Sequence, residues 1–173
     1  MDDGALRRAL AGLAQDGPAG FDALYEQLSV PVFTVILRIT QDRVLAEDVL
    51  QEFFLKLYRS PPGPEVKRLR AYLFQSARNL ALDALRREPR HAGLEECGDL
   101  PQPDPGDPAE RLDLERALAA LPLTDRQLVT LHINGGLKFR ELAELCGMPL
   151  GTVLWRYRRA IGTLKTLLDG GTL

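Results

Sequence analysis

The sequence predicts an all-α protein in which an acidic, proline-rich linker joins two small helical domains. Apolar residues recur every three or four positions along most of the chain, and no segment shows the strict alternation of a half-buried strand. Residues 91–108 interrupt this pattern with four prolines and several acids and glycines, and they offer almost nothing to bury. We therefore expect a helical domain at residues 1–89, a flexible linker at 90–108 and a second helical domain at 109–173.

Three helical segments and a loop are expected in the first domain before its last helix. A short helix spans residues 5–14, and a long one spans 21–40 with a kink or break near Val30, because Pro31 lacks the N–H that a helix interior needs. Asp42 is a suitable N-cap for a helix over 43–59. The sequence SPPGP at residues 60–64 predicts a loop.

The remaining helices follow from capping residues and breakers. The first domain ends with a helix over 67–88, which Pro89 terminates. The second domain is expected to begin with a helix over 109–121, for which Pro108 suits the first helical position. A second helix over 125–134 is expected to be capped by Thr124 and ended by Gly135-Gly136. A third helix over 139–146 and a turn at 147–149 lead to the last helix, from 151 to about 168.

The last two helices form a helix-turn-helix pattern, a motif that places its second helix in the major groove of DNA. In that second helix Val153, Tyr157, Ala160 and Leu164 form one apolar stripe. The residues from Gly151 to Lys165 include no acid, and the basic side chains lie away from the stripe. An acid-free basic face suits a polyanion.

The distribution of charge predicts that the chain binds DNA weakly by itself. The net charge is −2, and residues 91–112 carry 1 basic and 6 acidic residues while residues 113–173 carry 8 basic and 6 acidic ones. Because nonspecific affinity depends on neutralising phosphates, we expect a larger partner to bring this chain to DNA.

Several classes of protein are excluded by what the sequence lacks. No run is long and apolar enough to span a bilayer, and the N-terminus does not read as a secretory signal, so we expect no membrane insertion. Cys97 and Cys146 are far apart and are interpreted as free thiols in a reducing cytosol rather than zinc ligands. We expect no metal, no cofactor and no catalytic residue, and so no enzyme.

Two further segments of the first domain carry patterned charges. Glu47, Asp48, Gln51 and Glu52 share one face of the helix at 43–59, which is either a solvated surface or a docking face. The helix at 67–88 mixes cations with Tyr72 and Phe74, a combination that suits single-stranded nucleic acid unless the two aromatics belong to the core.

The order of these parts resembles bacterial RNA polymerase sigma factors, and most nearly their compact extracytoplasmic-function (ECF) group. LAEDVLQEFFLKLY (residues 45–58) is similar to that group's polymerase-binding helix in region 2, and AYLFQSARNLALDALRR (71–87) to its promoter-melting helix. Residues 117–168 are similar to region 4 nearly end to end. The resemblance covers about residues 20–88 and 110–168.

The resemblance implies core RNA polymerase, promoter DNA and an anti-sigma factor as partners in the cytoplasm. Within the polymerase it implies the clamp helices of the largest subunit, contacted by Asp48, Gln51 and Glu52 with Glu47 beside them, and the flap of the second-largest subunit. For the downstream (−10) promoter element it implies Lys67, Arg68, Arg70, Tyr72, Arg78, Asn79 and Arg86, with Asp83 pairing with Arg86 or Arg87 in a structural role. For the upstream (−35) element the implied base readers are Leu154, Trp155, Arg158 and Arg159, with Arg159 the best candidate for guanine, and the implied phosphate contacts are Lys138, Arg140, Thr152 and Arg156.

The sequence departs from the family at two places. Tyr72 stands where the family usually has Trp, and the loop at 60–66 lacks an aromatic, so the captured base is not predicted. Leu154 and Trp155 replace a common basic residue and Ser. Leu154 can touch a thymine methyl, and Trp155 packs either on a sugar or on the first helix of the motif.

Three other interpretations compete with the sigma factor. A regulator could use the same fold without polymerase, an enzyme could carry an appended DNA-binding domain, and an interaction module could be held by an inhibitor. The sequence shows no phosphate loop or activated nucleophile for the enzyme. For the acidic linker at 94–107, our hypothesis is that it threads near the polymerase active-site channel or RNA exit path.

Overall fold

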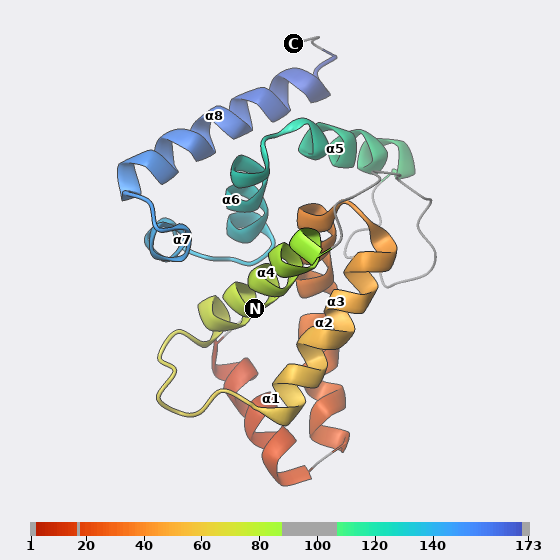
Figure 1. The fold of residues 1–173 in the computed structure, drawn as a ribbon, viewed down its shortest axis with the longest axis vertical. Helices are drawn as coiled ribbons and strands as arrows, with labels where there is room; N and C mark the ends of the chain where they lie inside the picture. The colour runs from red at the N-terminus through yellow and green to blue at the C-terminus, as the bar shows by residue number, and fades with distance from the viewer. Residues whose placement is uncertain (1–2, 17, 88–106, 171–173) are drawn as a thin grey trace. The chain divides into compact units, whose positions relative to one another are not determined.

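A computed structural model describes residues 3–16, 18–87 and 107–170, which form eight α-helices and no strand (Figure 1). The predicted all-α class is confirmed. The helices belong to two compact units, residues 1–101 and 102–173. Most of the expected linker at 90–108 lies outside the described residues, as does Cys97.

The N-terminal unit is built around its second helix. Its elements are α1 (Asp3–Asp16), α2 (Pro18–Thr40), α3 (Arg43–Arg59) and α4 (Leu69–Arg87), and α2 contacts each of the other three. The core between them is filled by fully buried side chains such as Leu28 and Ile36 of α2, Phe53 of α3 and Phe74 of α4. Each such burial contributes about 1.5–3 kcal/mol, so packing against α2 holds the unit together.

The sequence predicts either a kink or a break near Val30, because of Pro31. The helix α2 runs through Pro31 without a break. A proline inside a helix costs about 3 kcal/mol, because one backbone hydrogen bond is lost and its ring crowds the preceding turn. Val32, Val35 and Ile36 follow directly and are 0% exposed. Their burial offsets the cost of the proline, so tertiary packing keeps the helix continuous.

The helix α3 begins and ends where the sequence predicts. Its N-cap is Asp42, whose Oδ1 accepts a hydrogen bond of 2.8 Å from the Leu45 N–H. Capping of this kind satisfies one of the free N–H groups of the first turn. The cap fixes the start of the helix and therefore the rotation of its exposed face.

The helix α4 begins at Leu69, two residues later than the sequence predicts, and the residues from Ser60 to Arg68 form the loop before it. The first helical hydrogen bond runs from the Tyr72 N–H to the Arg68 carbonyl. The two preceding carbonyls, of Val66 and Lys67, instead accept from a side chain of α1. Both carbonyls therefore have a hydrogen-bond partner although they lie before the helix.

The C-terminal unit is assembled on its last helix. It holds α5 (Pro108–Ala120), α6 (Leu123–Ile133), α7 (Phe139–Cys146) and α8 (Leu150–Leu168), and α8 contacts each of the other three. The predicted stripe on α8 is confirmed, with Val153, Ala160 and Leu164 buried and Tyr157 partly buried. Ala160 and Leu164 belong to one core cluster with Leu118 and Val129, and Tyr157 packs against that cluster.

The start of α6 differs from the prediction. Thr124 was expected to cap the helix, but the helix begins at Leu123 and Thr124 lies inside its first turn. Pro122 occupies the capping position, and its carbonyl accepts the Arg126 N–H at 3.0 Å. The fixed φ of proline favours starting the helix directly after it. The glycine pair after this helix does form the expected turn, with Gly136 at φ 64°.

Candidate nucleic-acid and partner interface

The exposed face of α3 combines acids with apolar side chains. Asp48, Gln51 and Glu52 are exposed, and Val44 and Leu55 on the same side of the helix are 64% and 52% exposed. Residues spaced by three, four and seven positions share one helical face, so these five side chains form one continuous surface. We name it the α3 face; a partner would meet two apolar contacts and a concentrated negative charge there.

Glu47 lies at the edge of this surface. Its carboxylate pairs with Arg43 at 2.8 Å, one turn earlier on the helix. The ion pair partly neutralises Glu47, so the unpaired negative charge of the α3 face is carried mainly by Asp48 and Glu52.

The predicted strand-binding residues lie on both sides of the start of α4. Lys67 and Arg68 are exposed in the loop, Tyr72 is 41% exposed in the first turn, and Arg70 is half-buried near Asp3 of α1. Phe74, the second aromatic of the pattern, is 0% exposed. Phe74 is therefore a core residue, and Tyr72 is the aromatic of this pair with a face available to a base.

The remaining candidates lie further along α4. Arg78 donates to the Asn79 side chain at 3.3 Å, and Asn79 is exposed. Asp83 pairs with the exposed Arg86 at 2.7 Å, as the sequence predicts. Because Arg86 is held through one Nη atom, its other donors can still face a phosphate.

In the C-terminal unit, three aromatic rings hold the helices of the helix-turn-helix together. The His132 ring of α6 stacks on Phe139 of α7, with centroids 4.3 Å apart, and both rings meet Tyr157 of α8 edge-on at 5.0 Å. His132 Nδ1 lies 2.7 Å from the Leu137 carbonyl, which can only accept, so Nδ1 carries the proton. Such edge and stacked pairs stabilise beyond their buried area.

The turn between α7 and α8 depends on a glycine. Gly147 has φ 63°, a conformation that side chains disfavour, and the Met148 N–H donates to the Ala143 carbonyl at 3.0 Å. Cys146, beside this turn, is not part of a disulfide. The predicted turn is confirmed, and it directs α8 away from α7 at Pro149.

The most buried charge of the unit anchors the basic face of α8. Asp125, in the first turn of α6, is 1% exposed, and its two carboxylate oxygens accept hydrogen bonds of 2.7 Å from Arg156 and Arg159. Both arginines are one turn apart on α8 and remain partly exposed. A buried carboxylate with two charge-assisted bonds fixes both guanidinium groups relative to the core.

Arg159 has a second contact on its own helix. Its guanidinium lies over the Trp155 ring, 4.9 Å from the centroid, and that ring is 57% exposed. The cation–π contact and the Asp125 bond together hold Arg159 from two sides. Trp155 therefore presents an aromatic surface and a fixed arginine side by side.

The other predicted contacts of the helix-turn-helix are accessible. Lys138 and Arg140 are exposed at the start of α7, and Thr152 is exposed in the first turn of α8. Arg158, which directly precedes Arg159 in sequence, is also exposed. Leu154 is half-buried. The positive end of a helix and nearby cations form a surface suited to phosphates.

Arg126, next to Asp125, does not join this surface. Its guanidinium is buried and donates to the Ala119 carbonyl at 3.1 Å, which ties α6 to α5. Burial holds the pKa of Arg126 below its ordinary value, and the nearby charge of Glu115 offsets this only in part. Arg126 therefore stabilises the packing of α6 against α5 and adds no charge to the exposed basic surface.

Sequence reasoning missed two residues of these sites, Asp125 and Arg7. Asp125 reaches partners 31 and 34 positions away, and Arg7 binds carbonyls 59 and 60 positions away. Local spacing cannot show such pairs. The sequence carries no distinguishing signal for Asp125, because Glu110 and Glu141 also lie in the first turns of helices of this unit.

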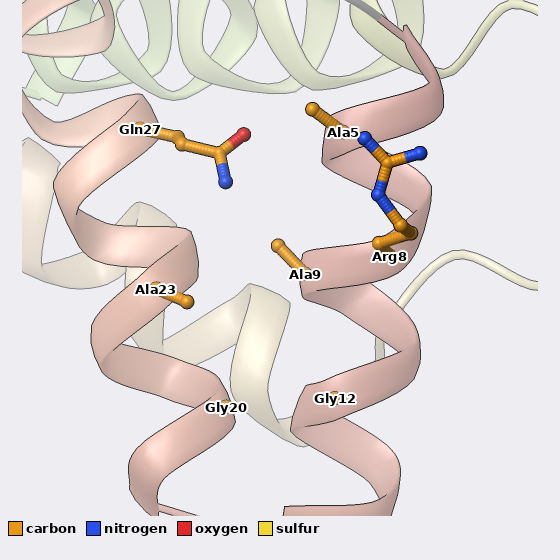
Figure 2. Close-up of a pocket in the computed structure, with 7 residues that line it drawn as sticks. All are labelled: Ala5, Arg8, Ala9, Gly12, Gly20, Ala23 and Gln27. Carbon is orange, nitrogen blue, oxygen red and sulfur yellow. The ribbon is translucent and has the colours of Figure 1, made fainter.

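A groove of about 710 Å³ runs between α1 and α2 (Figure 2). It is lined mainly by small residues, and the two helices approach so closely there that a Cβ on Gly20 would collide with the Gly12 backbone. Figure 2 shows Arg8 at the α1 side of this groove. The glycines serve helix packing, and no charged cluster converges on the groove.

Within the described residues, no group of three or more His, Cys, Asp or Glu side chains is placed to hold a metal ion. The described helices also include none with the length and hydropathy needed to cross a membrane.

Two segments of the chain match known family models, and the whole chain is similar to known proteins. Residues 24–91 match Sigma-70 region 2, and residues 111–164 match Sigma-70, region 4. The chain is 31% identical over 173 residues to the ECF RNA polymerase sigma factor SigE of Mycolicibacterium smegmatis, covering 88% of this chain and 67% of that one. It is 28% identical over 159 residues to SigM of Bacillus subtilis, covering 87% and 96%.

Solved structures share the fold. A structure of CnrH in complex with the cytosolic domain of CnrY matches with a TM-score of 0.68 and 23% identity over 97% of this chain and 99% of that one. The sigma factor RpoE of Bartonella quintana, in complex with the anti-sigma factor NepR, matches with a TM-score of 0.63 and 24% identity over 86% and 97%. The two matched regions and the relatives above show that this chain belongs to the ECF RNA polymerase sigma factors, which direct transcription initiation.

Proposed function

We propose that the α3 face is the surface through which this chain binds core RNA polymerase, at the clamp helices of the largest subunit. The observation that carries the proposal is the composition of that face: Asp48, Gln51 and Glu52 are exposed between the exposed apolar side chains of Val44 and Leu55. Apolar contacts supply affinity in an interface, and surrounding charges set orientation and the rate of encounter.

Promoter DNA is engaged by both units in this account. In the N-terminal unit, the loop at 60–68 and α4 bind the unpaired strand of the −10 element through Lys67, Arg68 and the open face of Tyr72. In the C-terminal unit, α8 lies in the major groove of the −35 element, with Arg158 and Arg159 as base readers. Exposed cations beside an aromatic support the first role, and an anchored basic helix supports the second.

The anchoring of Arg156 and Arg159 sharpens their proposed roles. Each gives donors to Asp125, so each approaches DNA with the rest of its guanidinium in a fixed direction. A base contact by Arg159 would use the donors left over from Asp125, beside the Trp155 ring. The exposed Arg158 keeps its rotamer freedom and can adapt to a phosphate or a base edge.

Further partners follow from the family. The flap of the second-largest polymerase subunit is the proposed contact of the C-terminal unit, and an anti-sigma factor is the proposed inhibitor, since RpoE was solved with the anti-sigma factor NepR. We place the chain in the cytoplasm with the polymerase. Catalysis in this account belongs to the polymerase, and the chain itself is not an enzyme and carries no cofactor.

The experiment that tests the proposal measures affinity for core RNA polymerase with matched charge variants. Asp48→Asn combined with Glu52→Gln removes two acids from the α3 face. Asp22→Asn combined with Glu26→Gln removes two exposed acids from α2 and serves as the control. We expect the first pair to weaken core binding at least tenfold and the second to leave it unchanged. Equal affinities for both pairs would instead favour a regulator that uses this fold without the polymerase.

A further inference from the structure

The N-terminal helix α1 is bonded to the backbone of the loop that leads into α4. Arg7 Nη2 donates to the Val66 carbonyl at 2.6 Å and to the Lys67 carbonyl at 3.1 Å. A guanidinium that bridges two consecutive carbonyls fixes the peptide planes that carry them, because both hydrogen bonds are directional and charge-assisted. The contact spans about 60 residues of sequence, so it joins two separate elements of the unit.

Other contacts hold α1 in place for this role. Leu6, the neighbour of Arg7, is 0% exposed, and α1 packs on both α2 and α4. At the start of the helix, Asp3 lies 3.8 Å from Arg70 in the first turn of α4. The helix lies before residue 24, where the match to Sigma-70 region 2 begins, so it adds to that region from outside.

The two carbonyls that Arg7 binds belong to the loop just before α4, where exposed cations lie. Val66 and Lys67 lie in the loop just before Arg68, the last residue ahead of α4, and the side chains of Lys67 and Arg68 are exposed. Since a side chain leaves the backbone along its Cα–Cβ bond, fixing the peptides at 66 and 67 restricts the directions that both cations can take. A restricted loop loses less entropy when it binds a strand.

We propose that Arg7 is a positioning residue for promoter melting: it holds the loop at 60–68 in the conformation that captures the unpaired strand of the −10 element. This inference rests on the proposed strand-binding role of that loop. It assigns to α1 a function in promoter opening, in which Arg7 acts through the backbone of Val66 and Lys67 and does not contact DNA itself.

The neighbouring arginine provides a matched control. Arg8 is exposed on the same helix and lies at the groove between α1 and α2 (Figure 2). Arg8→Ala removes the same charge from the same helix turn, so any general effect of lowering the charge of α1 appears in both variants. Arg7→Lys is the second variant, because it keeps the cation and the packing of α1 but loses the planar fork.

The test uses the full chain with core RNA polymerase on a promoter that the wild-type chain transcribes. The first measurement for each variant is its affinity for core polymerase. The second is the rate of promoter opening, which the permanganate reactivity of unpaired thymines reports. The third is the affinity of the assembled holoenzyme for single-stranded −10 oligonucleotides in which each base is substituted in turn. Arg7→Ala is expected to lower the opening rate and the preference for the correct base about tenfold, equivalent to about 1.4 kcal/mol. Core affinity should stay unchanged, and Arg7→Lys should fall between.

The outcomes separate this inference from the proposed function. If the wild-type chain supports no transcription, the proposed function fails, whatever Arg7 does. If the wild type is active and Arg7→Ala opens the promoter as fast as Arg8→Ala, the positioning role is overturned. If Arg7→Ala does not fold, the test relies on Arg7→Lys. An Arg7→Lys variant with the opening rate and base preference of the wild type would then overturn the positioning role of Arg7.

Discussion

Arg159 of α8 donates a hydrogen bond of 2.7 Å to the buried carboxylate of Asp125 in α6. The bond ties the basic face of α8 to the core of the C-terminal unit, and Arg156 makes the matching bond to the other oxygen. The face that is proposed to read DNA is therefore held in place before DNA arrives. Preorganisation of this kind lowers the entropy lost on binding.

Removing the anchor should affect both folding and DNA binding. Asp125→Asn leaves two cations without their partner, and we expect the free energy of unfolding of the C-terminal unit to fall by about 1–3 kcal/mol, less than for a fully buried pair because both arginines reach solvent. Affinity for −35 duplex should fall as well. Chemical denaturation and fluorescence anisotropy measure the two effects.

The control for this anchor is an exposed ion pair of the same unit. Asp113 lies 3.6 Å from Arg116 with both side chains well exposed, and Asp113→Asn should change unfolding by no more than about 0.5 kcal/mol. If Asp125→Asn were as mild as this control, the anchor would contribute nothing and the account of α8 would be wrong.

Adjacent arginines of α8 should respond differently to truncation. Arg158 is exposed, so Arg158→Ala should weaken −35 binding and leave the free energy of unfolding unchanged. Arg159→Ala should lower both, since it also removes a partner of Asp125. Loss of a base contact costs about 1–3 kcal/mol and relaxes the preference at one base pair. Binding to duplexes substituted at each position shows which arginine reads which pair, and identical profiles for the two variants would contradict the distinction.

Trp155 should tune the promoter choice through Arg159. Trp155→Ala removes the ring under the guanidinium, a contact worth about 0.5–1 kcal/mol at an exposed site. Trp155→Phe keeps an aromatic face and should preserve most of the base preference. We expect a selection of −35 sequences to change for the alanine variant and hardly for the phenylalanine variant. An equal change in both variants would contradict the cation–π role and would mean that the indole N–H, which both variants lack, makes the contact.

DNA binding by the isolated chain should be weak and sensitive to salt. The net charge is −2, so the chain as a whole gains no long-range attraction to DNA from its net charge, and the basic face of α8 is the proposed source of phosphate contacts. We expect the affinity for a promoter duplex to rise strongly when core polymerase is added. Titrations at several salt concentrations, with and without core polymerase, measure this, and tight binding by the chain alone would contradict it.

The acidic linker offers one more test. Replacing the acids within residues 94–107 by serine should raise abortive synthesis or alter initiation if the segment runs through a channel of the polymerase. Transcription assays that resolve short products from full-length RNA provide the measurement. Unchanged product ratios would contradict the hypothesis.

Much of this fold could be predicted from the sequence because its signals are local. Asp42 caps α3 as predicted, α3 and α7 have the predicted bounds, and Gly147 ends α7. Each rests on residues within one helical turn of each other, where spacing and capping chemistry decide the outcome.

The failures arise where distant residues decide the local structure. The packing around α2 overrides Pro31, and Arg7 bonds to carbonyls 59 and 60 positions away at a point where the local pattern predicts helix. Phe74 is core because of the helices that cover it, which the alternation of cations and aromatics cannot show. The pairing of Asp125 with α8 likewise becomes visible only in three dimensions.

The most direct test of the account is transcription in vitro by core RNA polymerase on a randomised promoter library, with and without the purified chain. A sigma factor with two promoter-binding units should start transcripts at one consistent distance from a pair of selected sequence elements, one upstream and one downstream. Transcripts equal in number and sequence to those of core polymerase alone would contradict it.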